Sequence, residues 1–158
     1  MPVPALAPRI IQQTQVGINQ CLATCIAMAL GITKLAIYDE IEEAGLDSNQ
    51  SLSLEHAKRI FCRHGVLLHS DSIGRPHSAG HLFIETLPCP SPLPILQNSH
   101  AIVVDTRGSE LEIFDPLGGM KEYRHYSTSS NERTVLYRPG WTQPYARYRL
   151  EDCNLKFV

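Results

Sequence analysis

Four residues of the types that can activate a thiol occur in the chain in the order Gln15, Cys21, His100 and Asp115. A cysteine thiolate attacks a carbonyl carbon when a histidine serves as general base and later acid, and when a carboxylate orients the imidazole. A glutamine amide can donate a hydrogen bond to the oxyanion that develops. The chemistry predicted from these residues is nucleophilic attack on an amide, with Cys21 as the nucleophile.

The surroundings of Cys21 favour this role. An apolar run begins at Cys21, continues to Leu30 and is followed by Gly31, which predicts a buried helix with a glycine stop. The unpaired N–H groups and the positive dipole at the start of a helix favour a thiolate there. Cys25 lies one turn later and has Asn19, not a glutamine, six residues before it, so we expect it to pack in the core.

The base and its orienting carboxylate are predicted to meet at the open end of a hairpin. His100 heads a β-branched run that reaches Asp105, and a second run leads from Glu110 to Asp115. A turn with its tip near residues 107–108 joins the two runs. Such a hairpin places His100 beside Asp115, and the proline after Asp115 ends the second strand.

Other histidines and cysteines are weaker candidates for chemistry. His125 is the reserve choice as base. His77 and His81 have a spacing that would suit a metal on a helix, but Gly80 makes a helix improbable, so we expect a loop. Cys62 has no second ligand pair at a zinc-site spacing. We therefore expect no metal and no cofactor.

The segment Gln15-Val-Gly-Ile-Asn-Gln-Cys21-Leu-Ala-Thr-Cys25 resembles the active-site entry of the double-glycine leader peptidases. These are papain-like cysteine proteases, best known as the N-terminal domain of bacteriocin-exporting ABC transporters. In that family a Gln precedes the nucleophilic Cys by six residues, a small residue or second Cys follows by four, and a His and then an Asp-Pro come later. The resemblance spans residues 15 to about 119. It implies a papain-like fold, with Gln15 in the oxyanion hole and His100 and Asp115 completing a triad.

The same triad allows more than one outcome. Release of an amine would make the protein a cysteine protease, which the resemblance favours. Release of ammonia from a glutamine side chain would make it a protein glutamine deamidase of the bacterial effector or toxin type. The family usually reads Asp/Glu-Cys-Gly-Pro at the nucleophile, whereas this chain has Gln20-Cys21-Leu22-Ala23. Leu22 in place of that glycine keeps a third possibility open, an inactive papain-like binding module.

The pattern along the chain predicts a single α+β catalytic domain over residues 1–158, with helices first and an antiparallel sheet second. Residues 1–14 would form a lead-in, residues 88–94 a rigid proline-rich loop, and residues 120–158 additional C-terminal strands. The predicted helices cover 21–30, 34–44 and 53–64. The predicted strands cover 66–69, 82–85, 101–105, 111–114, 134–137 and 146–150.

The composition limits the kinds of partner and the compartment that we expect for the protein. The net charge of −2 and the mixed-sign surface argue against nucleic-acid binding, and no apolar segment reaches the roughly 20 residues of a membrane span. The proline-containing start lacks the pattern of a signal peptide, and five unevenly placed cysteines favour a reducing compartment. We expect a cytoplasmic enzyme, or an effector exported without a classical signal. Its partners would be a protein or peptide substrate and a delivery or immunity protein.

Overall fold

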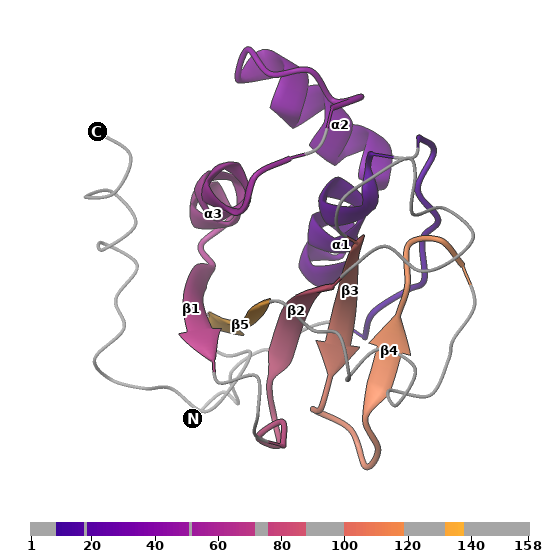
Figure 1. Ribbon diagram of the computed structural model, residues 1–158, viewed down its shortest axis with the longest axis vertical. Helices are drawn as coiled ribbons and strands as arrows, with labels where there is room; N and C mark the ends of the chain where they lie inside the picture. The colour runs from indigo at the N-terminus through magenta and orange to yellow at the C-terminus, as the bar shows by residue number, and fades with distance from the viewer. Residues whose placement is uncertain are drawn as a thin grey trace, which may run out of the picture.

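A computed structural model describes residues 9–17, 19–50, 52–71, 76–87, 100–118 and 132–137. Within these ranges three helices precede five strands (Figure 1), so the predicted α+β order is confirmed. The predicted strand at 146–150, the proline-rich loop and His125 lie outside the described residues. The elements are α1 (Cys21–Leu30), α2 (Lys34–Glu43), α3 (Leu54–Arg63), β1 (Leu67–Asp71), β2 (Leu82–Leu87), β3 (His100–Asp105), β4 (Glu112–Phe114) and β5 (Glu132–Tyr137).

The helix ends follow local capping chemistry. Gly31 ends α1 in a left-handed conformation with φ of 72°, which a residue with a Cβ adopts only at a cost. The side chain of Ser53 accepts a hydrogen bond from the His56 N–H at the start of α3, and Thr33 does the same for Ala36 at the start of α2. The predicted helix boundaries are therefore correct to within one residue.

The five strands form one antiparallel sheet in the order β1-β5-β2-β3-β4. The hairpin predicted between β3 and β4 is present, with Val103 opposite Phe114 and Asp105 opposite Glu112. β5 pairs with both β1 and β2, so a strand that comes late in the chain lies inside the sheet. This placement could not be foreseen from local patterns.

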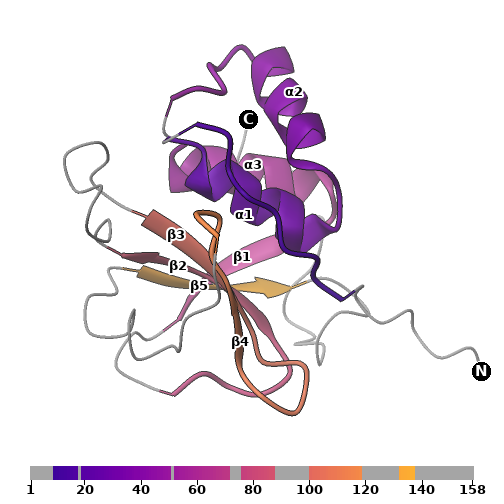
Figure 2. The same ribbon diagram turned by 90° about the vertical axis from the view of Figure 1, so that its right-hand side faces the viewer.

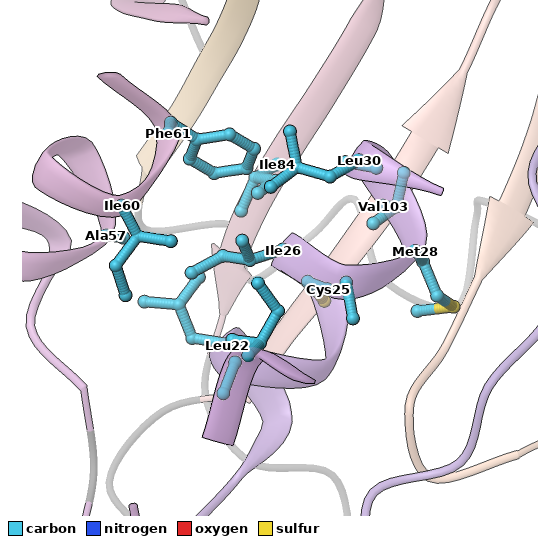
Figure 3. Close-up of a cluster of buried hydrophobic side chains, with 14 of the residues drawn as sticks. Leu22, Cys25, Ile26, Met28, Leu30, Ala57, Ile60, Phe61, Ile84 and Val103 are labelled. Atoms are coloured by element: carbon cyan, nitrogen blue, oxygen red, sulfur yellow. The ribbon is translucent and has the colours of Figure 1, made fainter. Parts of the chain in front are cut away.

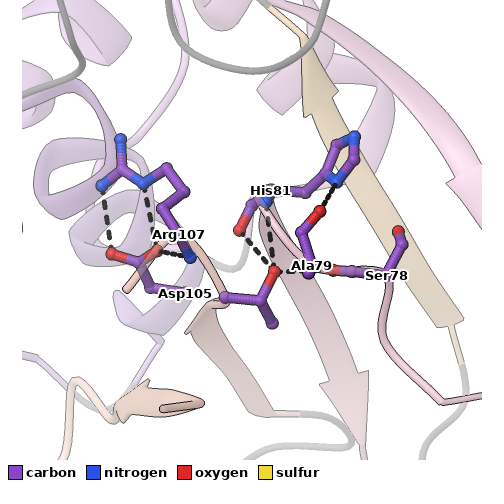
Figure 4. Close-up of polar contacts among 6 residues, drawn as sticks. Ser78, Ala79, His81, Asp105 and Arg107 are labelled. Atoms are coloured by element: carbon purple, nitrogen blue, oxygen red, sulfur yellow. Dashed lines mark hydrogen bonds and ion pairs between the residues drawn. The ribbon is translucent and has the colours of Figure 1, made fainter. Parts of the chain in front are cut away.

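The turn of the β3–β4 hairpin is held by polar contacts at the end of the sheet away from His100 (Figure 4). The Arg107 guanidinium donates to both carboxylate oxygens of Asp105, at 3.0 Å each. The Thr106 hydroxyl donates to the Ser78 carbonyl at 2.7 Å, and its oxygen accepts from the His81 N–H. The segment with His77 and His81 is thus a loop, as predicted, and these contacts tie it to the hairpin.

The helices lie together on one side of the sheet, which Figure 2 shows most clearly. Every residue of α1 is buried, because α1 contacts β3 below it and α2 and α3 beside it. Figure 3 shows the resulting core, where Ile26 of α1 lies near Ile60 and Phe61 of α3. Cys25 belongs to this core and is completely buried, as expected.

A second apolar cluster and a buried ionic group occupy the opposite face of the sheet. Glu85 of β2 is fully buried, and its carboxylate lies 2.9 Å from His77 Nε2 and 3.4 Å from Arg133 Nε. Arg133 also lies 3.6 Å from Asp71. A buried carboxylate is tolerated when such partners compensate for its lost hydration. The apolar residues of this cluster are Phe83, Ile102, Val104, Ile113 and Val135.

Among the described residues, no single helix is both long and apolar enough to cross a membrane. Taken together, α1 and α2 have sufficient length and apolar character, but the chain bends by 115° between them.

The left-handed end of α1 gives a stability prediction. Gly31→Ala should lower the free energy of unfolding by about 1 kcal/mol, because it forces a Cβ into the left-handed conformation. Gly108→Ala is the control: the chain there does not have a positive φ, and an added Cβ would meet only the side chain of Glu112 and a backbone oxygen at ordinary distances. Urea unfolding measures the free energy of unfolding of both variants. Equal stability of the two variants would contradict the account of the helix end.

Candidate active site

Cys21 is the first residue of α1, as the sequence predicts. Gln20 precedes it in a non-helical conformation. Among the described residues, no side chain caps this end and no acidic residue stands in the first turn of α1. The N–H groups of that turn and the positive end of the helix dipole therefore act directly on the position of the Cys21 sulfur. This environment favours an anion, either a thiolate or a developing oxyanion.

His100 and Asp115 meet at the open end of the β3–β4 hairpin. His100 Nε2 lies 2.6 Å from Asp115 Oδ1, and the exposed fractions of the two side chains are only 0% and 5%. The Leu117 N–H also donates to Asp115 Oδ1, at 2.9 Å, which holds the carboxylate in place. The predicted juxtaposition of His100 and Asp115 is thus present in the structure.

The imidazole of His100 is shared between Asp115 and Cys21. Burial lowers the pKa of His100, but hydrogen bonds to Asp115 and Cys21, together with their negative charges, outweigh burial and raise that pKa to about 9. Because Asp115 occupies Nε2, Nδ1 is the ring nitrogen left for the Cys21 thiol. His100 is therefore a cation at neutral pH, placed between the Asp115 carboxylate and the Cys21 sulfur.

Cys25 has a different environment from Cys21, although it lies on the same helix. Complete burial, followed by the charges of Cys21 and Asp115, raises the pKa of the Cys25 thiol well above its usual value. A thiol held in its protonated form is a poor nucleophile. Both cysteines are buried in the core, but of the two only Cys21 lies beside His100 and lines the cavity.

Gln15 lies close in the fold but is engaged elsewhere. Its backbone N–H donates to the Pro116 carbonyl at 2.7 Å, which ties the segment before α1 to the loop after β4. Its side-chain amide donates to the Gly17 carbonyl at 2.7 Å, and its Oε1 is buried without a hydrogen-bond partner. For the predicted oxyanion role, a proton of this amide must turn towards Cys21.

A cavity of about 210 Å³ opens beside the Cys21–His100 pair. The sequence patterns did not identify its other walls. Asn19 is close to Cys21 in sequence, so its position could have been inferred, but Glu132 enters the cavity only because β5 pairs with β2 and places Glu132 opposite Thr86. The lining residues are Asn19, Cys21, Leu22, Leu52, Ser53, Leu54, Thr86, His100, Ala101 and Glu132.

Comparison with models of known protein families and with curated proteins finds no match to the chain. The resemblance to leader peptidases therefore rests on the residues from Gln15 to Asp115 and their order. Within the described parts of the chain, no group of three or more His, Cys, Asp or Glu side chains is placed to hold a metal ion.

The raised pKa of His100 predicts a pH-dependent contribution to stability. His100 binds its proton more tightly in the folded chain, where its pKa is about 9, than at its ordinary value of 6.5. The contribution is therefore complete below pH 6.5 and is lost as the pH rises through 9. Its size is about 3 kcal/mol at most. His100→Gln should remove this dependence in urea unfolding between pH 6 and about 9.5, and parallel curves for the variant and the wild type would contradict it.

Proposed function

We propose that the protein is a papain-like thiol hydrolase that cleaves an amide bond in a protein or peptide, with Cys21 as nucleophile. The observation that carries the proposal is the position of His100, which is hydrogen-bonded to Asp115 on one side and to Cys21 on the other. Cys21 begins a buried helix, and both Cys21 and His100 line a cavity. Nucleophile, base and orienting group in contact are the signature of activated thiol chemistry.

In the first half of the reaction, the Cys21 sulfur attacks the substrate carbonyl carbon. The carbonyl oxygen gains negative charge, which the Cys21 N–H at the start of α1 and the amide of Gln15, once turned, would stabilise. When the intermediate collapses, the carbon–nitrogen bond breaks and His100 gives its proton to the leaving nitrogen. A thioester on Cys21 remains.

In the second half, His100 is neutral and acts as a base. It takes a proton from a water molecule, whose oxygen attacks the thioester carbon and releases the carboxylic acid. The thiolate and the imidazolium form again. Asp115 keeps Nε2 of the ring engaged throughout, so that Nδ1 faces the reacting atoms. The proposed fold follows the same arrangement, since the nucleophile lies on a helix and the base and its orienter lie on the sheet against which that helix packs.

The two cysteines provide the direct test of the nucleophile. Cys21→Ala should abolish turnover, and Cys25→Ala should retain it at a somewhat lower stability, because Cys25 contributes only to the core. Mass spectrometry of a proteome treated with each variant and with the wild type measures the outcome. New termini that depend on Cys21 identify a protease, and Gln-to-Glu conversion without cleavage identifies a deamidase. The absence of any Cys21-dependent product would leave the protein as a binding module.

The oxyanion role of Gln15 has its own test. Gln15→Ala should lower the turnover number by about 10²–10³ if the amide turns from Gly17 to the oxyanion in the transition state. Gln50→Ala changes an exposed glutamine outside the cavity and should leave the rate unchanged. A near-normal rate for Gln15→Ala, with both variants folded, would show that the Gln15 side chain only closes the loop before α1.

A further inference from the structure

Glu132 stands out among the cavity residues because none of the residues that the structure describes compensates its charge. It is exposed at the start of β5 and lines the cavity that contains Cys21. Within the described residues, its carboxylate makes no hydrogen bond and no ion pair, in contrast to the buried Glu85 on the opposite face. An uncompensated charge beside a cavity acts on whatever enters the cavity.

The neighbouring cation does not neutralise Glu132. Successive side chains of a strand point to opposite faces of the sheet, and Arg133 is buried on the face away from the helices, where it pairs with Glu85 and Asp71. Of the described residues that line the cavity, only His100 can carry a positive charge. Among the described residues, the carboxylates of Asp115 and Glu132 outnumber this one positive charge, so the site has a net negative charge.

The remaining walls of the cavity combine apolar and hydrogen-bonding groups. Apolar surface comes from Leu22, Leu52, Leu54 and Ala101. The polar side chains that line the same cavity can accept hydrogen bonds. A lysine or arginine side chain matches this combination, because its aliphatic stem covers apolar surface while its charged end seeks an anion. An acidic side chain would meet repulsion from Glu132.

We propose that the cavity is a subsite for a lysine or arginine side chain of the substrate, and that Glu132 determines this specificity. The inference rests on the proposed hydrolase function. It assigns a class of substrate, basic peptides, and gives Glu132 a binding role that is separate from the bond-breaking residues.

Charged thiol reagents test the subsite without a known substrate. The rate at which Cys21 of the full chain reacts with a cationic reagent, trimethylammonioethyl methanethiosulfonate, is compared with the rate for the anionic sulfonatoethyl reagent. Peptide mapping by mass spectrometry isolates the Cys21 adduct. Glu132→Gln should lower the cationic-to-anionic rate ratio by about fivefold, and Glu132→Lys should lower it further. Glu110→Gln is the matched control, since it removes the same charge from an exposed position in the hairpin turn.

The cationic-to-anionic rate ratio of the wild type should also decrease in about 1 M salt, because salt screens an exposed carboxylate. A ratio that is the same in Glu132→Gln and the wild type would overturn the subsite, even if the protein hydrolyses peptides. A Cys21 that reacts with neither reagent would overturn both the subsite and the hydrolase.

A peptide library separates the two proposals. Peptides that differ only by lysine, norleucine or glutamate at one position near the scissile bond should be cleaved in that order of preference, and Glu132→Gln should remove the advantage of lysine. Cleavage with no preference for lysine in the wild type would overturn the subsite alone. A rate ratio that responds to Glu132, together with neither cleavage nor Gln-to-Glu conversion of any peptide, would overturn the hydrolase and leave a cavity that binds basic side chains.

Discussion

The enclosure of α1 is the constraint on which the rest of the structure depends. A helix that is apolar on every side is stable only when other elements cover it completely, and all ten residues of α1 are buried between the sheet, α2 and α3. The helix begins at Cys21, and the strand it packs along begins at His100. Burial of apolar surface, which drives folding, therefore also brings the thiol to the imidazole.

Two buried carboxylates show how similar interactions differ in consequence. Asp115 and Glu85 each lie next to a histidine, and each needs that partner because burial removes its hydration. Glu85 is closed in by His77 and Arg133 on the face away from the helices. Asp115 has its histidine at the end of the sheet, where the other side of the ring is open to a thiol and a cavity. The two pairs therefore differ in position rather than in kind, because of the two only the His100–Asp115 pair lies beside a thiol and a cavity.

Local patterns in the sequence were sufficient for the parts of the fold that are set by neighbouring residues. Gly31 and Ser53 mark helix ends through backbone conformation and capping, and the hairpin that brings Asp115 to His100 follows from two short runs joined by a turn. The contact between Cys21 and His100 was predicted from the residue types that activate a thiol, but other contacts between distant segments were not. The place of β5 in the sheet brings Glu132 to the cavity, and the hydrogen bond from the Gln15 amide to the Gly17 carbonyl depends on loop geometry that no spacing encodes.

The interior position of β5 affects the order in which the strands can pair as the chain is synthesised. β5 is the last of the described strands in the chain, yet it is the only one of them that pairs with β1. While the protein is being synthesised, the edge of β1 stays unpaired until β5 leaves the ribosome, and an unpaired edge is prone to aggregation. Because Glu132 is the first residue of β5, that same event completes the wall of the cavity. A nascent chain thus contains Cys21 and His100 before the wall of the proposed subsite is complete.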